Sequence, residues 1–86
     1  MNTRPLTLSR QIAQLISEVK HIPKYRLMPS TNLYRSLHFD IKDVVDVILV
    51  LEQHFHINIP DEVPVETVGD LIRFVGNTAP DMQAAA

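Results

Sequence analysis

Apolar residues recur at helical spacing in three parts of the chain, and the first is residues 8–20. Its apolar positions are three and four residues apart, which places them on one side of a helix. They are Leu8, Ile12, Leu15, Ile16 and Val19. Thr7 is a suitable N-cap, and Pro23 predicts that the helix ends near His21.

The second segment begins at Asp40 and is the most apolar part of the chain. Its β-branched residues favour a strand, but Asp40 followed by Asp43 is typical of a capping box, and the acidic residues fall at helical spacing. We therefore predict a helix. Its expected buried positions are Val45, Ile48, Leu51 and Phe55, with exposed apolar surface near Ile41 and Val44.

The third segment starts with Thr67 and Asp70, a second N-terminal capping signature. A helix is predicted to follow, with Gly76 as its C-cap and Pro80 preventing its continuation. The apolar positions of this helix are Val68, Leu71, Ile72 and Val75.

Two connections separate these helices. Residues 22–37 contain Pro and polar residues typical of a loop, yet Leu27, Leu33 and Leu37 recur within it and predict attachment to the core. In the second connection, Asp61 and Glu62 are expected to form one short helix before a proline. The predicted fold is an all-α bundle of three main helices and one short helix, with a long first loop.

A chain of 86 residues is too short to fill two hydrophobic cores. We predict a single domain over residues 1–86, with a structured core at about 6–77 and a flexible tail at 78–86. The absence of Cys excludes disulfides, thiolate zinc sites and thiol catalysis. No apolar run has the length of a membrane span and no signal peptide is evident, so a soluble cytoplasmic protein is expected.

Charge is distributed unevenly along the chain. Residues 1–36 contain six basic residues and one acidic residue, whereas residues 37–86 contain two basic and nine acidic residues. A strongly acidic face repels nucleic acid and attracts basic protein surfaces. The simpler alternative is that the opposite charges only solvate two faces. His54 and His56 diverge on a helix end, so no metal site is expected.

The run from Leu51 to Glu62, which reads LEQHFHINIPDE, and the TVGD sequence that starts at Thr67 resemble the acyl carrier protein family. Upstream, several positions are similar to the family's loop before its second helix. They are Leu27, Pro29, Thr31, Leu33, Leu37 and Asp40. The resemblance covers roughly Ile12 to Val75, and it implies the same all-α bundle.

The family attaches a phosphopantetheine arm to a Ser at the start of its second helix. The equivalent position here is Ile41, so the resemblance implies that this site has lost its function and no cofactor is predicted. Ser36 is a weak alternative hydroxyl, because it precedes the helix start. Lys42 stands where the family has Leu, and His38 stands where it has Gly.

The resemblance also implies a surface that docks onto basic patches of synthases and acyl-transferring enzymes. The residues of this expected docking surface are Asp40, Asp43, Asp46, Glu52, Asp61 and Glu62. Alternatively, Asp40 and Asp43 only cap the helix, and Lys42 with Asp46 forms an exposed pair four residues apart.

Three functions follow as hypotheses, none of which makes the chain an enzyme. The leading one is a monomeric carrier-like module that is not phosphopantetheinylated and that acts through an acidic docking helix on enzymes of fatty-acid or polyketide metabolism. The second is a functional carrier that uses another hydroxyl such as Ser36. The third is a non-covalent binder of acyl chains, because relatives shelter chains between their helices.

Overall fold

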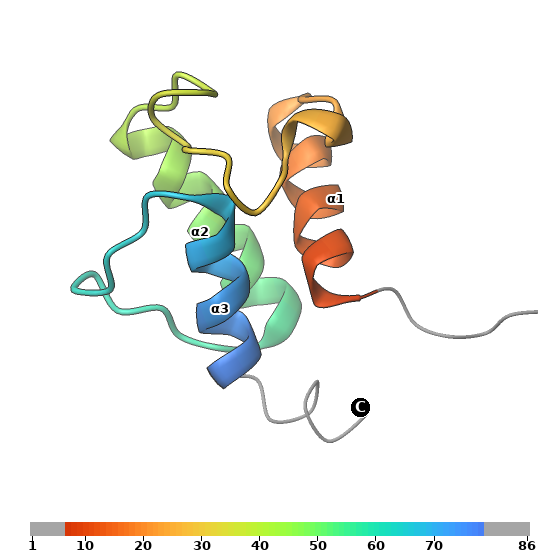
Figure 1. The fold of residues 1–86 in the computed structure, drawn as a ribbon. Coiled ribbons are helices and arrows are strands. Elements are labelled where there is room, and N and C mark those ends of the chain that lie inside the picture. The colour runs from red at the N-terminus through yellow and green to blue at the C-terminus, as the bar shows by residue number, and fades with distance from the viewer. Residues whose placement is uncertain (1–6, 79–86) are drawn as a thin grey trace, which may run out of the picture.

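The computed structural model describes residues 7–78, which form three α-helices and one short 3-10 helix (Figure 1). These are α1 (Leu8–Lys20), η1 (Lys24–Arg26), α2 (Ile41–Phe55) and α3 (Val68–Thr78). The predicted all-α bundle is confirmed, and the only β-type pairing in the described part is an isolated bridge between Asn32 and Thr67. The predicted tail lies outside the described residues, apart from Thr78 at the end of α3.

Side-chain caps start all three α-helices, as the sequence predicts. The Thr7 hydroxyl accepts the backbone N–H three residues further on at 3.3 Å. Asp40 and Asp43 form a reciprocal capping box at 2.9 and 3.1 Å. Thr67 and Asp70 form another, at 3.1 and 3.0 Å. Each cap satisfies N–H groups that a helix leaves without an internal acceptor, so the starts of the helices are set locally.

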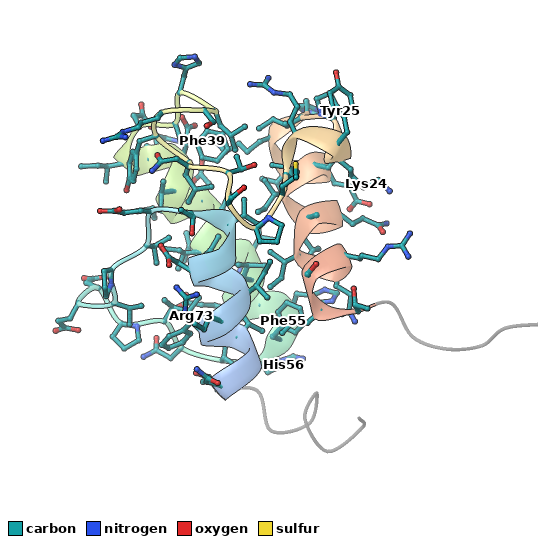
Figure 2. All side chains as sticks on the ribbon, viewed as in Figure 1. Lys24, Tyr25, Phe39, Phe55, His56 and Arg73 are labelled. Carbon is teal, nitrogen blue, oxygen red and sulfur yellow. The ribbon has the colours of Figure 1, made fainter. Side chains whose placement is uncertain are left out.

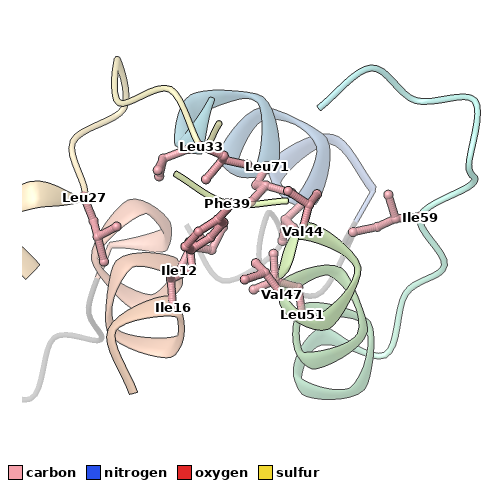
Figure 3. Close-up of a cluster of buried hydrophobic side chains, with 12 residues drawn as sticks. Ile12, Ile16, Leu27, Leu33, Phe39, Val44, Val47, Leu51, Ile59 and Leu71 are labelled. Carbon is pink, nitrogen blue, oxygen red and sulfur yellow. The ribbon is translucent and has the colours of Figure 1, made fainter. Parts of the chain in front are cut away.

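One hydrophobic core joins the helices and the first connection (Figure 3). Its buried members are Ile12, Ile16, Leu27, Leu33, Phe39, Val44, Val47, Leu51, Ile59, Val68, Leu71 and Val75. Three of them, Leu27, Leu33 and Phe39, come from the connection between α1 and α2. The first connection is therefore part of the core, as its recurring leucines predict.

The buried side of α2 differs from the prediction at Val44, Val45 and Val47. Val44 is only 5% exposed, whereas Val45 is 44% exposed, so the expected burial of Val45 and exposure of Val44 were both wrong. Val47 was also expected to be partly exposed but is buried, and the predicted burial of Leu51 is confirmed. Successive residues on a helix are about 100° apart, and α2 has apolar residues on several sides. Contact with the rest of the core, rather than the pattern within α2, therefore selects the buried face.

Gly76 is not the C-cap of the last helix, because α3 continues to Thr78. A Cβ atom at position 76 would lie 3.3 Å from Cδ2 of Leu8, which is tighter than ordinary van der Waals contact. The glycine therefore lets the start of α1 approach the end of α3, and Figure 1 shows these two ends at the same end of the bundle.

The expected short helix at Asp61 and Glu62 is a single turn. The Val63 N–H donates to the Pro60 carbonyl at 3.1 Å, and Pro64 follows without an N–H to extend the pattern. The short helix of this fold lies in the first connection instead, as η1.

Backbone hydrogen bonds tie the first connection to the start of α3. The Leu33 N–H donates to the Glu66 carbonyl and the Gly69 N–H donates to the Pro29 carbonyl, both at 2.8 Å. A Cβ atom on Gly69 would lie 2.8 Å from that same Pro29 oxygen, a distance that real Cβ atoms do not adopt. The contact between the two segments therefore requires glycine at position 69.

Two histidines end helices in the left-handed conformation that favours glycine, since His21 and His56 both have φ of 57°. Replacing either by Gly removes Cβ strain, and we expect the free energy of unfolding to rise by about 0.5–1 kcal/mol. Urea unfolding monitored by circular dichroism measures the change.

His54 provides the matched control, because it lies two residues before His56 but within α2. The same His→Gly change there should lower the stability by about 1 kcal/mol. If all three variants lost stability, backbone strain at His21 and His56 would be the wrong explanation.

Candidate functional site

Ile41 occupies the first helical position of α2, directly after the Asp40 cap. Its side chain is 74% exposed, so the residue takes no part in the core. The backbone N–H groups at the start of a helix favour a phosphate group. The Ile41 side chain, however, contains only carbon and hydrogen. It therefore offers no atom to which phosphopantetheine could be esterified, and the site does not fit that group.

Ser36 lies in a turn of the first connection and is exposed. Its N–H donates to the Asn32 carbonyl at 2.9 Å, and its own carbonyl accepts from Nη2 of Arg26 at 2.8 Å. Its backbone is thus already hydrogen-bonded, and it lies outside the helix start. The structure does not bring Ser36 into the position that Ile41 occupies.

A hollow of about 370 Å³ lies beside Ile41, between α2 and the second connection. Most of its lining is apolar, and it includes Tyr34, Ile41, Val45, Ile48, Ile59 and Val63. Asp61 also lines it. This hollow gives α2 an apolar side that is distinct from its carboxylate-bearing side.

Lys20 connects the carboxylates of α2 to the end of α1. Its Nζ lies 2.8 Å from Oδ1 of Asp43 and 3.0 Å from Oδ2 of Asp46. The side chains are 17%, 33% and 34% exposed in that order. Lys42 adds the predicted exposed pair with Asp46, at 3.4 Å. We call Lys20, Lys42, Asp43 and Asp46 the charge cluster.

The contacts within the charge cluster shift the ionisation of its members. The hydrogen bond from Lys20 lowers the pKa of Asp43, with a further contribution from the Asp40 N–H. The pKa of Asp46 is lowered mainly by Lys20, and burial opposes the change. Asp43 and then Asp46 raise the pKa of Lys20. All three shifts favour the charged forms, as expected for groups that hydrogen-bond to an opposite charge.

The sequence contains no local signal for the role of Lys20. It lies 23 and 26 residues before its two carboxylate partners, so no helical spacing relates them. Only the packing of α1 against α2 brings the ammonium group to the carboxylates. Asp43 and Asp46, by contrast, are close in the sequence and share one side of α2.

The other expected docking residues are dispersed. Asp40 caps α2, and Oε2 of Glu52 accepts the Ile59 N–H at 2.7 Å, which fixes the start of the second connection. Asp61 and Glu62 are exposed, and neither forms an ion pair within residues 7–78. Four of the six expected docking carboxylates thus also stabilise the fold.

Within residues 7–78, no group of three or more His, Asp or Glu side chains could hold a metal ion. The ring of His54 packs edge-on against Phe55, with centroids 4.8 Å apart, and Figure 2 shows Phe55 and His56 at the end of α2. In the same described range, no helix is long and apolar enough to cross a membrane.

Comparisons with known proteins relate the chain to small carrier proteins. The acyl carrier protein of Helicobacter pylori strain J99 is 31% identical over 72 residues, which cover 81% of this chain and 92% of the relative. That of Prochlorococcus marinus strain MIT 9515 is 29% identical over 68 residues, which cover 77% of this chain and 85% of the relative. No family model matches the chain.

The chain belongs to the acyl carrier protein family, because the first relative reaches this identity over most of both proteins. The resemblance inferred from the sequence is confirmed. Proteins of this family are carriers and not enzymes, in agreement with the expectation for this chain.

The charge cluster predicts how stability depends on pH. The lowered pKa values of Asp43 and Asp46 contribute stability that is present above the unfolded value of 3.8 and is lost as the pH falls through the folded values. The raised pKa of Lys20 contributes stability that is present below 10.5 and is lost as the pH rises through the folded value. We therefore expect Lys20→Gln to lower stability between these limits and to flatten the loss of stability in acid.

Urea unfolding of wild type and Lys20→Gln at pH values from about 2 to about 8 tests this expectation, because this range includes the titration of Asp and Glu side chains. Lys24→Gln is the matched control, because Lys24 is exposed on η1 and forms no ion pair within residues 7–78. Part of the acid dependence should survive in every variant, since the N–H of Glu66 and then that of Thr67 lower the pKa of Asp70. Identical acid limbs for Lys20→Gln and wild type would contradict the role of Lys20.

Proposed function

We propose that the chain is a carrier-like module that is not phosphopantetheinylated and that acts by docking onto enzymes of fatty-acid or polyketide-type metabolism. Its docking surface is α2 with the adjoining turn, where Asp43, Asp46, Asp61 and Glu62 present carboxylates to basic surfaces of synthases or acyl-transferring enzymes. A cytoplasmic location and a monomeric state are part of this proposal.

The observation that carries the proposal is the state of position 41. The fold and the capped start of α2 are those expected for a carrier, but the exposed side chain at that start is Ile41. Without a hydroxyl, no phosphodiester can form there. The neighbouring α2 nevertheless has the carboxylates of Asp43 and Asp46 on its surface, which supports a function in recognition rather than in covalent transport.

Intact mass after incubation with coenzyme A and a broad-specificity phosphopantetheinyl transferase tests the proposal. We expect wild type to keep its mass and Ile41→Ser to gain one phosphopantetheine group, because the substitution places a hydroxyl on the first turn of α2. Ile41→Ala is the matched control, since it shortens the same side chain without adding a nucleophile.

Two results would count against the proposal. A mass gain in wild type would show that another hydroxyl is used, and fragment mapping would then begin at Ser36. Failure of Ile41→Ser to react, in a sample that circular dichroism shows to be folded, would show that the surface of a carrier is not retained.

A second candidate function is non-covalent binding of an acyl chain, and the apolar hollow beside Ile41 is the observation that favours it. A fatty acid that binds only the folded state should stabilise it by about 2.7 kcal/mol at 100 times its Kd. Thermal unfolding with decanoic acid measures this. Val63→Phe adds bulk to the lining of the hollow and should reduce the ligand-induced shift, whereas an equal shift in both proteins would place binding elsewhere.

A further inference from the structure

The charge cluster joins two cations and two carboxylates within one small area of the surface. Lys20 lies within hydrogen-bond distance of both Asp43 and Asp46, and Lys42 is 3.4 Å from Asp46. The charges of the four side chains sum to zero. The chain itself therefore neutralises Asp43 and Asp46, but not the other carboxylates of the expected docking surface.

Because Lys20 and Lys42 neutralise Asp43 and Asp46, a basic partner would encounter a weaker negative potential at these two carboxylates. An incoming Lys or Arg must share Asp43 and Asp46 with an ammonium group that already holds both. Lys20 is less exposed than either carboxylate, at 17% against 33% and 34%, so water screens it least of the three. Like charges brought together at an interface oppose binding, so Lys20 weakens the docking of a basic partner onto these two carboxylates.

The apolar side of α2 offers a different surface. Ile41, Val45 and Leu49 are four residues apart in turn and form one stripe along the helix. They are 74%, 44% and 49% exposed, and two of them, Ile41 and Val45, also line the apolar hollow. A contiguous exposed apolar surface with a polar margin is typical of a protein interface.

We propose that Lys20 acts as an internal competitor for the cations of a basic partner, so that docking through Asp43 and Asp46 is weakened and contact with the apolar stripe contributes more to binding. The inference rests on the proposed function, because it specifies the partner of a helix already assigned to docking. Asp61 and Glu62 are exposed and form no ion pair within residues 7–78, so they still offer carboxylates to a basic partner. Lys20 therefore weakens docking by charge without abolishing it. Lys20 is thus a residue that determines specificity.

The experiment measures how strongly a basic enzyme uses the acidic side of α2. The probe is a phosphopantetheinyl transferase with a basic docking surface, acting on the Ile41→Ser variant with coenzyme A. Adding Lys20→Gln should lower its KM by about 3- to 10-fold, because the carboxylates become available. It should also make kcat/KM fall more steeply with added NaCl.

Lys24→Gln in the same background is the matched control, since it changes the net charge equally. Figure 2 shows Lys24 at the edge formed by α1 and η1. Because Lys24 forms no ion pair within residues 7–78, the Lys24→Gln variant should leave KM unchanged. Asp46→Asn gives a second comparison that retains Lys20 and the capping box. Lys20 already binds the Asp46 carboxylate, so this change should alter KM by less than about 2-fold, which is the effect expected for loss of a weak surface contact.

The outcomes separate this inference from the proposed function. If Ile41→Ser is not modified at all, the proposed function fails. If it is modified, but Lys20→Gln and Lys24→Gln give the same KM and the same salt dependence in folded samples, the role of Lys20 is wrong. A rise in KM of about 10-fold or more in Asp46→Asn would also overturn the role of Lys20, because a loss of that size is typical of a charge pair formed directly with the partner.

Sedimentation of the wild-type protein tests whether a second copy of the chain covers the stripe of Ile41, Val45 and Leu49. We expect a monomer at every concentration, and a Leu49→Lys variant should behave in the same way. A concentration-dependent dimer that Leu49→Lys dissociates would overturn the inference, because a second copy of the chain would then cover the stripe.

Discussion

The fold depends on the attachment of the first connection to the start of α3. The hydrogen bonds from Leu33 to Glu66 and from Gly69 to Pro29 fix this attachment, and they place Leu33 and Phe39 in the core between the helices. Phe39 immediately precedes the Asp40 cap, so the same constraint positions the locally capped start of α2 against the core. The position and exposure of Ile41 follow from it. A small all-α domain whose helices are joined by long connections needs such ties, because helix packing alone leaves the connections free.

Several polar residues serve both the fold and the surface. Asp43 closes the capping box of α2 and binds Lys20, and Glu52 fixes the Ile59 backbone. Substituting such a carboxylate therefore changes stability together with recognition. Exposed ion pairs contribute little energy individually, but Lys20 is partly buried and holds two partners at once. Its main effect is on the electrostatic potential that another protein would encounter.

The proposed function and the further inference describe the same helix from two sides. Membership of the acyl carrier protein family supports the proposed use of α2 as a docking element. At its start, Ile41 replaces the nucleophile that a covalent carrier requires and extends the apolar stripe by one residue. On its acidic side, Lys20 supplies the charge that a basic partner would otherwise supply. Together these features support a partner that combines charge with contact to the apolar stripe.

The sequence by itself determined the features that depend on neighbouring residues. Thr7, Asp40 and Thr67 predicted the helix starts, because a cap bonds to N–H groups only three residues away. The four-residue spacing likewise predicted the pair of Lys42 with Asp46, and the resemblance to the acyl carrier protein family identified Ile41 as the position without the expected hydroxyl. Tertiary structure decided the rest. The apolar run of α2 has no single hydrophobic side, so packing alone chose Val44 over Val45 for the core, and Gly76 serves the approach of Leu8 rather than a helix end. Lys20 reaches Asp43 and Asp46 only because α1 packs against α2, and no pattern in the sequence records a contact across 23 residues.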